Sequence, residues 1–215
     1  MAILYPHATL SPTKLELLTP WLPMRSWYRG PAEPMLTRVT GYRFDDPDGE
    51  VGIETLLVQA EDGPLFQVPL TYRGTPLDGR DEWLVGTSEH SVLGPRWIYD
   101  GCGDPLYART LATAIITGAS GAEEFASIDG RQERRAPTMT VRGGGTRDAA
   151  APSVSTILSV HDGNPTVIVT DSVHLAVHRL LSLGAGAGHD ERAVLTGTWG
   201  LQPAPVLLAQ VQATG

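Results

Sequence analysis

The sequence contains a single lysine, Lys14, against fifteen arginines. Several chemistries need a lysine ammonium in a pocket: phosphate binding by a Walker loop, Schiff-base formation, and the strand lysine that holds nucleotide phosphates in kinases. Lys14 lies near the N-terminus, in a stretch whose leucines recur at helical spacing. The scarcity of lysine therefore disfavours these reactions, and no other complete set of catalytic residues replaces them.

Cysteine, net positive charge and long apolar runs are also scarce. Cys102 is the only cysteine, which excludes an internal disulfide and a paired-thiolate zinc site. The net charge of −8 disfavours nucleic acid, whose phosphates would be repelled, and we interpret the one basic cluster, Arg131, Arg134 and Arg135, as a solvated loop. No run approaches the roughly 18 apolar residues of a membrane span. We expect a cytoplasmic protein that binds neither nucleic acid nor membrane and has no metal or cofactor.

The first 118 residues have the pattern of a mixed helix and strand unit. Ser11 is a candidate helix cap and Pro12 suits the first helical position, ahead of Leu15, Leu18 and Leu22, while Pro20 and Pro23 limit the length. Strands are expected at residues 35–44, 51–60, 65–72, 83–90 and 91–99, with a hairpin at Asp48–Gly49. Pro69 lacks an amide donor, which predicts an edge strand or a bulge.

A second helix is predicted after Asp104, its cap, with Pro105 in the first turn and Gly118 at the end. The polar segment beyond it contains a loop near 143–152 that we interpret as flexible. Strand patterns then return, with another flexible loop near 184–193. We predict an α+β fold: an antiparallel sheet with two main helices at 1–118, followed by a smaller antiparallel sheet domain at 119–215.

Several segments together resemble a known family. RSWYRG, GYRF, GIETLLV, QVPLTYRG and WIYDGCGDPLY are similar to the N-terminal cap domain of bacterial maltokinases. Maltokinases have an aminoglycoside-phosphotransferase-like fold in which the cap precedes the kinase N-lobe, and residues 153–181 resemble the strands of that N-lobe. The resemblance implies a place in maltose, trehalose or α-glucan metabolism.

The chain departs from that family where phosphoryl transfer depends on charge. Aligned on Arg179, the lysine that grips nucleotide phosphates is replaced by Ala176. No catalytic-loop motif or metal-binding aspartate motif follows, and the 34 residues after Leu181 are too few for a catalytic lobe. Phosphoryl transfer needs positioned cations and a catalytic carboxylate. We therefore expect a non-catalytic binding or regulatory module, and the alternative is a sugar phosphotransferase component that needs a separate chain for its catalytic lobe.

Other candidate sites are better explained structurally. His174 and His178 would be metal ligands on a helix, but on a strand they lie about 13 Å apart. The acidic turn at 45–50 lacks the glutamate that completes a calcium loop. A hydrolase triad from Ser88, Ser91, His90 and Asp100 lacks a nucleophile motif, and the glycines at 143–145 lack the strand and helix of a phosphate loop.

Aromatic rings and arginines offer a candidate binding surface. Such residues are enriched in the centres of interfaces, although core packing is the alternative explanation. Trp27 and Tyr28 lie in a proline-rich loop, and Tyr72 and Arg73 lie where a strand turns. We predict that these four residues bind a protein partner, such as an enzyme of glucan or trehalose metabolism, or a carbohydrate.

Overall fold

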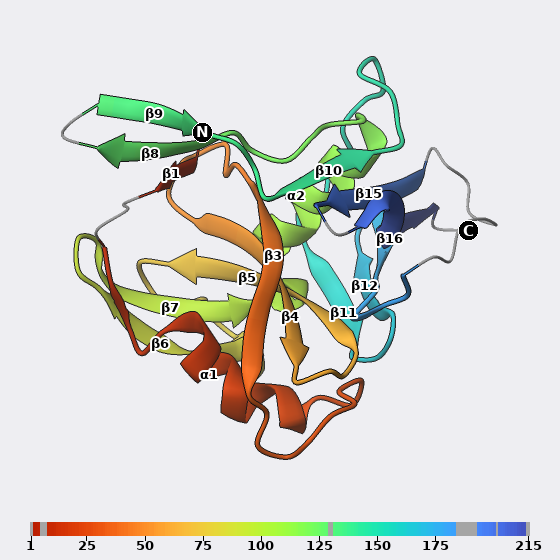
Figure 1. Ribbon diagram of the computed structural model, residues 1–215. Coiled ribbons are helices and arrows are strands. Elements are labelled where there is room, and N and C mark those ends of the chain that lie inside the picture. The colour runs from red at the N-terminus through yellow and green to blue at the C-terminus, as the bar shows by residue number, and fades with distance from the viewer. Residues whose placement is uncertain (1, 5–7, 129–130, 184–192, 201, 214–215) are drawn as a thin grey trace.

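The computed structural model describes residues 2–4, 8–128, 131–183, 193–200 and 202–213. Within these residues the chain forms mostly antiparallel sheets and two helices, so the predicted α+β fold is confirmed (Figure 1). The helices are α1 (Lys14–Trp21) and α2 (Pro105–Ile116). Short 3-10 turns occupy Leu22–Met24, Asp81–Trp83 and Gly101–Gly103.

The described strands form two large sheets and one small sheet. The first large sheet has the order β2 (Leu10–Ser11), β6 (Leu84–His90), β7 (Gly94–Asp100), β5 (Leu65–Arg73), β4 (Gly52–Ala60) and β3 (Leu36–Phe44), with β14 (Leu180–Leu181) beside β5. The second has the order β10 (Met139–Gly143), β15 (Val194–Trp199), β16 (Gln202–Ala213), β13 (Val173–Val177), β12 (Thr166–Thr170) and β11 (Ile157–His161). The small sheet joins β1 (Ala2–Leu4), β8 (Glu124–Ile128) and β9 (Arg131–Arg135), with β1 and β8 parallel.

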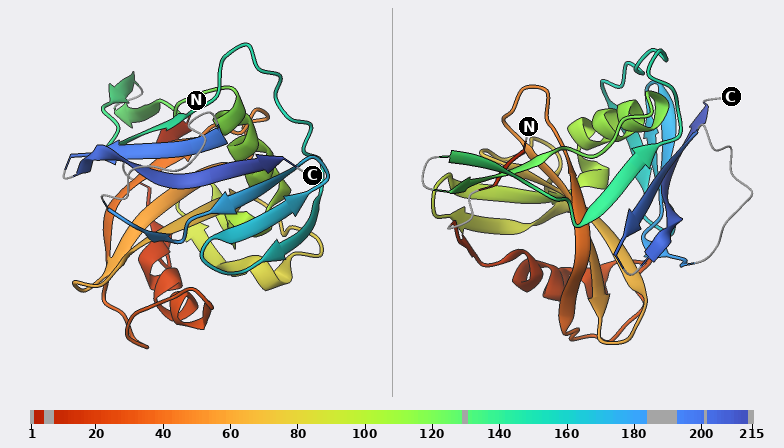
Figure 2. Two further views of the ribbon diagram at one scale, coloured as in Figure 1. Left: turned by 90° about the vertical axis from the view of Figure 1, so that its right-hand side faces the viewer. Right: turned by 45° about the horizontal axis from the view of Figure 1, so that its top comes forward.

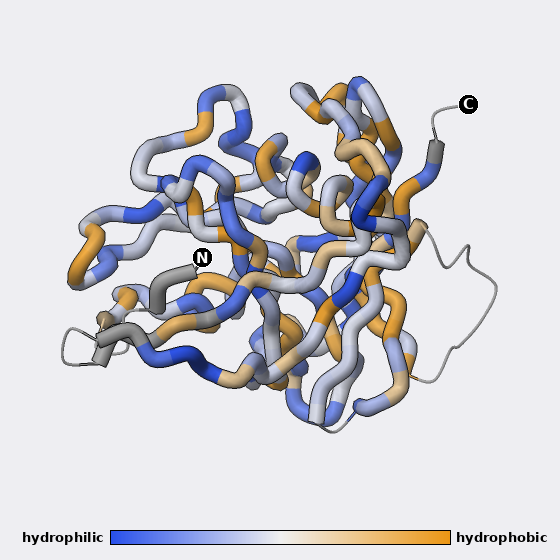
Figure 3. The backbone as a smooth tube through the Cα atoms, turned by 90° about the horizontal axis from the view of Figure 1, so that it is seen from above, coloured by the Kyte–Doolittle hydropathy of each residue, from blue (hydrophilic) through white to orange (hydrophobic). Residues whose placement is uncertain are grey.

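Strand β4, which lies between β5 and β3, is largely apolar on both faces because both faces are covered. Leu56 and Val58 pack in a cluster with α1, whereas Ile53 and Leu57 pack in a cluster with α2 and the second sheet. Alternate residues of a strand point to opposite faces, so a strand covered on both sides has a nearly continuous apolar sequence. Figure 2 shows α1 on one side of the first sheet and α2 on the other, and apolar segments gather in the interior in Figure 3.

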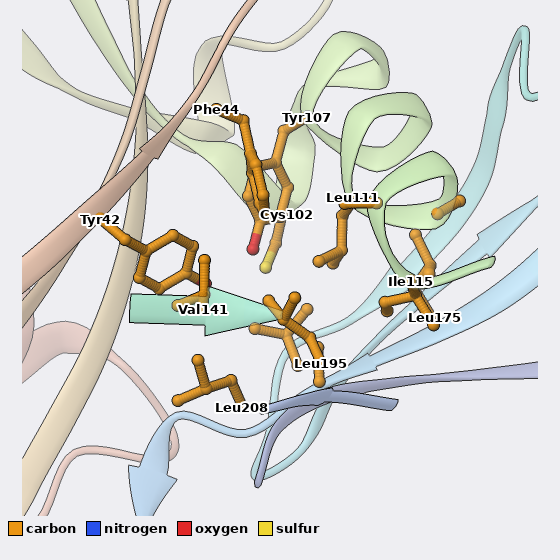
Figure 4. Packing of buried hydrophobic residues seen from close by; sticks show 14 of the residues in the cluster. Tyr42, Phe44, Cys102, Tyr107, Leu111, Ile115, Val141, Leu175, Leu195 and Leu208 are labelled. Atoms are coloured by element: carbon orange, nitrogen blue, oxygen red, sulfur yellow. The ribbon is translucent and has the colours of Figure 1, made fainter. Parts of the chain in front are cut away.

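One hydrophobic core joins the two large sheets through α2. Figure 4 shows Tyr42 from β3, Leu111 and Ile115 from α2, and Leu175 and Leu195 from the second sheet in this cluster. Residues on both sides of position 118 therefore share one core. The division into domains at that position stays a prediction, but packing is continuous across it.

Both helices begin with a capping side chain. Asp104 caps α2 by accepting a hydrogen bond from the Leu106 amide at 2.9 Å, as predicted, and Gly118 follows the helix with a positive φ. The prediction for α1 is wrong by two residues. Thr13, not Ser11, is its N-cap, and Thr13 forms a reciprocal capping box with Glu16.

Pro69 lies within a sheet, which corrects the prediction of an edge strand or a bulge. It faces Thr55 of β4 without a shift in register. On its other side, β5 pairs with β14 through Leu65 and Phe66 and with β7 only from Leu70 onward. Pro69 occupies the gap between these two partners, where a missing amide donor breaks no ladder hydrogen bond.

The polar stretch after α2 also differs from the prediction. Arg131–Arg135 form β9 rather than a loop, and Arg134 makes an exposed ion pair with Glu123. At 143–152, the glycine amides contact α2: Gly145 donates to the Ile115 carbonyl at 2.9 Å. The predicted loop at 184–193 lies, except for its last residue, outside the described residues. No helix in the described part of the chain is long and apolar enough to cross a lipid bilayer.

Candidate ligand pocket

A polar cavity of about 260 Å³ lies between the start of α1 and the first large sheet. Its polar lining comes from several elements: Lys14, Arg43, Glu50, Glu54, Tyr72, His90 and Arg96. A second cavity of about 300 Å³ lies beside β10, but its charged side chains Arg134 and Arg135 are exposed. Since strongly perturbed, buried ionisable groups mark functional sites, the cavity containing Glu54 is the stronger candidate.

Strand register brings three of these residues together. Arg43 of β3 lies directly opposite Glu54 of β4, and Tyr72 of β5 lies opposite Gly52, two residues before Glu54. Residues two apart on a strand share a face, so all three side chains lie on the face that carries α1. Lys14 is the first residue of α1 and is held there by the Thr13 capping box.

Glu54 is the charged centre of the site. Its side chain is only 1% exposed, and its Oε1 atom lies 3.1 Å from Arg43 Nη2 and 3.4 Å from Arg38 Nη2. Lys14 donates to Oε2, and the Tyr72 hydroxyl donates to the same oxygen at 3.1 Å. Burial alone would raise the pKa of Glu54, but Lys14, Arg43 and Arg38 outweigh it and lower that pKa to about 2.

The pKa of Lys14 is also lowered from its ordinary value. Burial lowers it most, Glu54 opposes this, and the neighbouring Arg43 and Arg38 lower it further. The ammonium lies 5.1 Å from the centroid of the Tyr72 ring. Burial, with Glu54 next in importance, raises the pKa of Tyr72, so its hydroxyl stays a donor. Three cations thus share one carboxylate.

His90 and Arg96 form the opposite wall. His90 Nδ1 accepts hydrogen bonds from the Val92 and Leu93 amides at 3.2 and 3.1 Å, which places any ring proton on Nε2. Burial, followed by Arg96, lowers the pKa of His90 and favours the neutral ring. Arg96 donates from Nη2 to the Leu93 carbonyl at 2.6 Å.

The structure does not bring the four predicted surface residues together. Trp27 and Tyr28 are 2% and 8% exposed and pack against Phe66 beneath α1. Arg73 makes two hydrogen bonds of 2.7 Å to the carboxylate of Asp104, the cap of α2. Of the four, only Tyr72 lines the pocket. Core packing, the alternative explanation, therefore describes the environment of Trp27 and Tyr28.

Residues 153–181, the segment compared with a kinase N-lobe, make buried contacts with residues of the first sheet. Ala176 is buried in β13, 2% exposed. Arg179 is fully buried and donates from Nη2 to Asp100 at 2.6 Å and from Nε to the Thr166 hydroxyl at 2.8 Å. Its guanidinium lies 4.9 Å from the Trp27 ring centroid. This arginine therefore acts as an internal cross-link.

The four remaining candidate sites have structural explanations. His174 lies on β13 and His178 directly follows it, as the strand interpretation requires; among the described residues no group of three or more metal-ligating side chains occurs. The carboxylate of Asp46 accepts hydrogen bonds from the amides of Asp48, Glu50 and Val51, which makes the acidic turn a hairpin loop.

The residues of the candidate triad and of the candidate phosphate loop also make structural contacts with other parts of the chain. Ser88 donates to the Pro12 carbonyl at 2.7 Å, and Ser91 accepts from the Thr9 amide. Asp100 is paired with Arg179. The amides of residues 143–145 donate to the carbonyls of Ala119, Val194 and Ile115, so they do not point into an anion site.

Sequence reasoning missed Glu54 and the role of Lys14. The available signal was a lone acidic residue inside the apolar strand sequence GIETLLV, since a buried carboxylate needs a partner. The unique lysine is that partner. Its distance of 40 positions along the chain concealed the pairing.

The segments that carried the sequence resemblance surround these features. A comparison with curated proteins finds no match for the chain. A comparison with protein families finds one at residues 21–104, which span β3 to β7 and include Arg43, Glu54, Tyr72, His90 and Arg96. The resemblance is thereby confirmed for this segment: residues 21–104 match the family model of the maltokinase N-terminal cap domain.

Proposed function

We propose that this maltokinase-related chain is a non-catalytic binding or regulatory module that acts in the cytoplasm. It would work in maltose, trehalose or α-glucan metabolism by binding a carbohydrate or a protein partner, such as an enzyme of those pathways. The support for the metabolic context is the cap-domain match at residues 21–104. The polar cavity beneath α1 supports a binding role.

One observation carries the non-catalytic part of the proposal: the strand compared with the kinase phosphate-binding strand offers no cation to a nucleotide. Ala176 has no charge, and Arg179 is fully buried against Asp100. Lys14, the only lysine, is held by Glu54 at the start of α1. Phosphoryl transfer needs cations positioned on the transferred phosphate. Neither group on β13 or next to it can supply one.

Thermal unfolding with and without nucleotide tests this proposal. A ligand that binds the folded state raises the melting temperature, so a nucleotide site would respond to ATP with Mg²⁺ more strongly than to ATP alone. We expect no Mg²⁺-dependent shift. A clear Mg²⁺-dependent shift would support the alternative, a phosphotransferase component that needs a separate catalytic lobe.

A further inference from the structure

We propose that the pocket lined by Lys14, Arg43 and Arg96 binds the phosphate group of a small phosphate monoester. The inference rests on the proposed function, because it names the ligand class of the binding module. The three cations come from three separate elements, α1, β3 and β7. All three line the same cavity of about 260 Å³.

Positive charge is in excess around Glu54. A structural ion pair needs one cation for one carboxylate, but Lys14, Arg38 and Arg43 all lie within ion-pair distance of Glu54. Gathering like charges in a partly buried site is costly unless an anion or solvent compensates them. The excess occurs in a chain of net charge −8, so it is a local feature of this site.

Lys14 and Arg43 are more accessible from the cavity than the carboxylate that they share. The Glu54 side chain is 1% exposed, whereas the Lys14 and Arg43 side chains are 21% and 20% exposed. The carboxylate of Glu54 therefore lies behind the cations and holds them in place. The exposed Glu50 also lines the cavity, but the other accessible charged groups of the lining, Lys14, Arg43 and Arg96, are cationic. The Lys14 ammonium carries three N–H donors, and one of them is directed to Glu54.

The shape of a phosphate group fits these three cations better than the shape of a carboxylate does. A phosphate monoester presents three terminal oxygens in a tetrahedral arrangement and carries up to two charges. It can accept hydrogen bonds from three cations on three elements at once, whereas a planar carboxylate has two oxygens. Arginine matches phosphate geometry well, and Arg43 and Arg96 supply two guanidinium groups.

The size of the cavity limits the ligand. Pockets for drug-sized molecules are typically 300–1,000 Å³, so about 260 Å³ suits a phosphate joined to a group the size of one sugar ring. Gly52 helps to set the size of the cavity, because a Cβ atom at this position would lie 3.3 Å from the Tyr72 ring. Larger side chains at position 52 would narrow the cavity without changing its charge.

Calorimetric titration at fixed ionic strength tests the inference. The probes are glucose 1-phosphate, inorganic phosphate and glucose, each added to the full chain. We expect glucose 1-phosphate to bind, inorganic phosphate to bind more weakly, and glucose to give no signal. Absence of binding by both phosphates, or binding of glucose as strong as that of glucose 1-phosphate, would overturn the inference.

Two variants locate the site. Arg96→Gln removes a cation that does not contact Glu54, so the ion cluster and the fold should remain, and affinity for glucose 1-phosphate should fall roughly tenfold or more. Gly52→Val should weaken binding by filling space. Arg109→Gln removes the same charge from the exposed face of α2 and should change the affinity less than about twofold. Equal affinity in all three variants would place binding elsewhere and contradict the inference.

These outcomes differ from those that test the proposed function. ADP release would contradict the non-catalytic function whatever the pocket binds. Failure of the phosphates to bind would contradict only the assignment of the pocket. Any ATP binding through the phosphate-accepting wall should be independent of Mg²⁺ and should weaken in Arg96→Gln.

Discussion

Among single residues, Glu54 has the largest influence on the pocket. It is buried on strand β4, between β5 and β3, and cations from α1 and β3 surround it. Removing it would leave Lys14, Arg38 and Arg43 without their shared counter-ion. Because uncompensated buried charge is strongly destabilising, the site is coupled to the stability of the whole chain.

This coupling predicts how stability depends on pH. The pKa of Glu54 is lowered to about 2 in the folded chain from 4.5, so its stabilisation is complete above pH 4.5 and is lost as pH falls toward 2. The linked loss is roughly 3 kcal/mol. Urea unfolding should be measured for the wild type and for Glu54→Gln between about pH 6 and about pH 2. Plotted against pH, the unfolding free energies of the two proteins should converge at low pH. If the two curves stayed parallel, the loss of stability at low pH would not come from protonation of Glu54.

Among elements, α1 depends on the capping box at its start. Thr13→Ala removes the side chain that accepts from the Glu16 amide, and it should cost about 1 kcal/mol of unfolding free energy. Ser11→Ala is the matched control and should have little effect, because Ser11 lies in β2 rather than at the helix. Chemical denaturation measures both, and a larger loss in Ser11→Ala would contradict the assignment of the cap.

The end of α2 depends on glycines that are distant in sequence. A Cβ atom on Gly145 would lie 1.9 Å from the Ile116 carbonyl oxygen, a distance at which the backbone must move. Gly145→Ala should therefore destabilise the chain by about 1–3 kcal/mol. Gly163→Ala is the control, since its nearest contact is 3.5 Å and its φ is not positive. Equal melting temperatures for the two variants would contradict this close approach.

Elements with a strong apolar pattern could be predicted from the sequence. β3 to β7 and α2 follow hydrophobic periodicity, turn residues and an unambiguous cap at Asp104. The hairpin of β8 and β9 could not be predicted in this way. In β9, Arg134 and Arg135 are exposed, and within the described residues this strand pairs with β8; its sequence therefore lacks the alternation of apolar residues that marks a strand with a buried face.

The site was less accessible to sequence reasoning than the fold. Trp27 was predicted to be a surface residue because a proline-rich loop is usually exposed, but its ring is buried and its Nε1 donates to Asp162 at 2.7 Å. Glu54 and Lys14 are joined by tertiary packing alone. Such pairs across distant segments have no local pattern, so only the structure reveals them.

At the scale of the whole molecule, buried polar contacts join the two large sheets. Asp100 at the end of β7 binds Arg179, which follows β13, and Trp27 binds Asp162. Gln67 of β5 adds hydrogen bonds from Nε2 to the carbonyls of His178 and Leu208. The segments RSWYRG and WIYDGCGDPLY thus contribute to internal contacts. The likeness of the second sheet to a kinase N-lobe stays a prediction.

The Arg179–Asp100 pair predicts a large effect on stability. Arg179→Met leaves the buried Asp100 without its cation, which should cost about 3–5 kcal/mol. Arg179→Lys should rescue only part, because an ammonium cannot reproduce bonds to both Asp100 and Thr166 in the same geometry. Arg109→Met is the exposed control. If Arg179→Met unfolded at the same urea concentration as the control, the pair would not join the sheets.

We propose that this chain does not transfer phosphoryl groups, because Ala176 offers no cation and Arg179 is held in the core. The most direct test is ADP release by the purified protein with Mg²⁺, ATP and maltose, followed across the protein peak of a gel-filtration column. We predict release no faster than in buffer. ADP formation that rises and falls with the protein across the peak would contradict the claim.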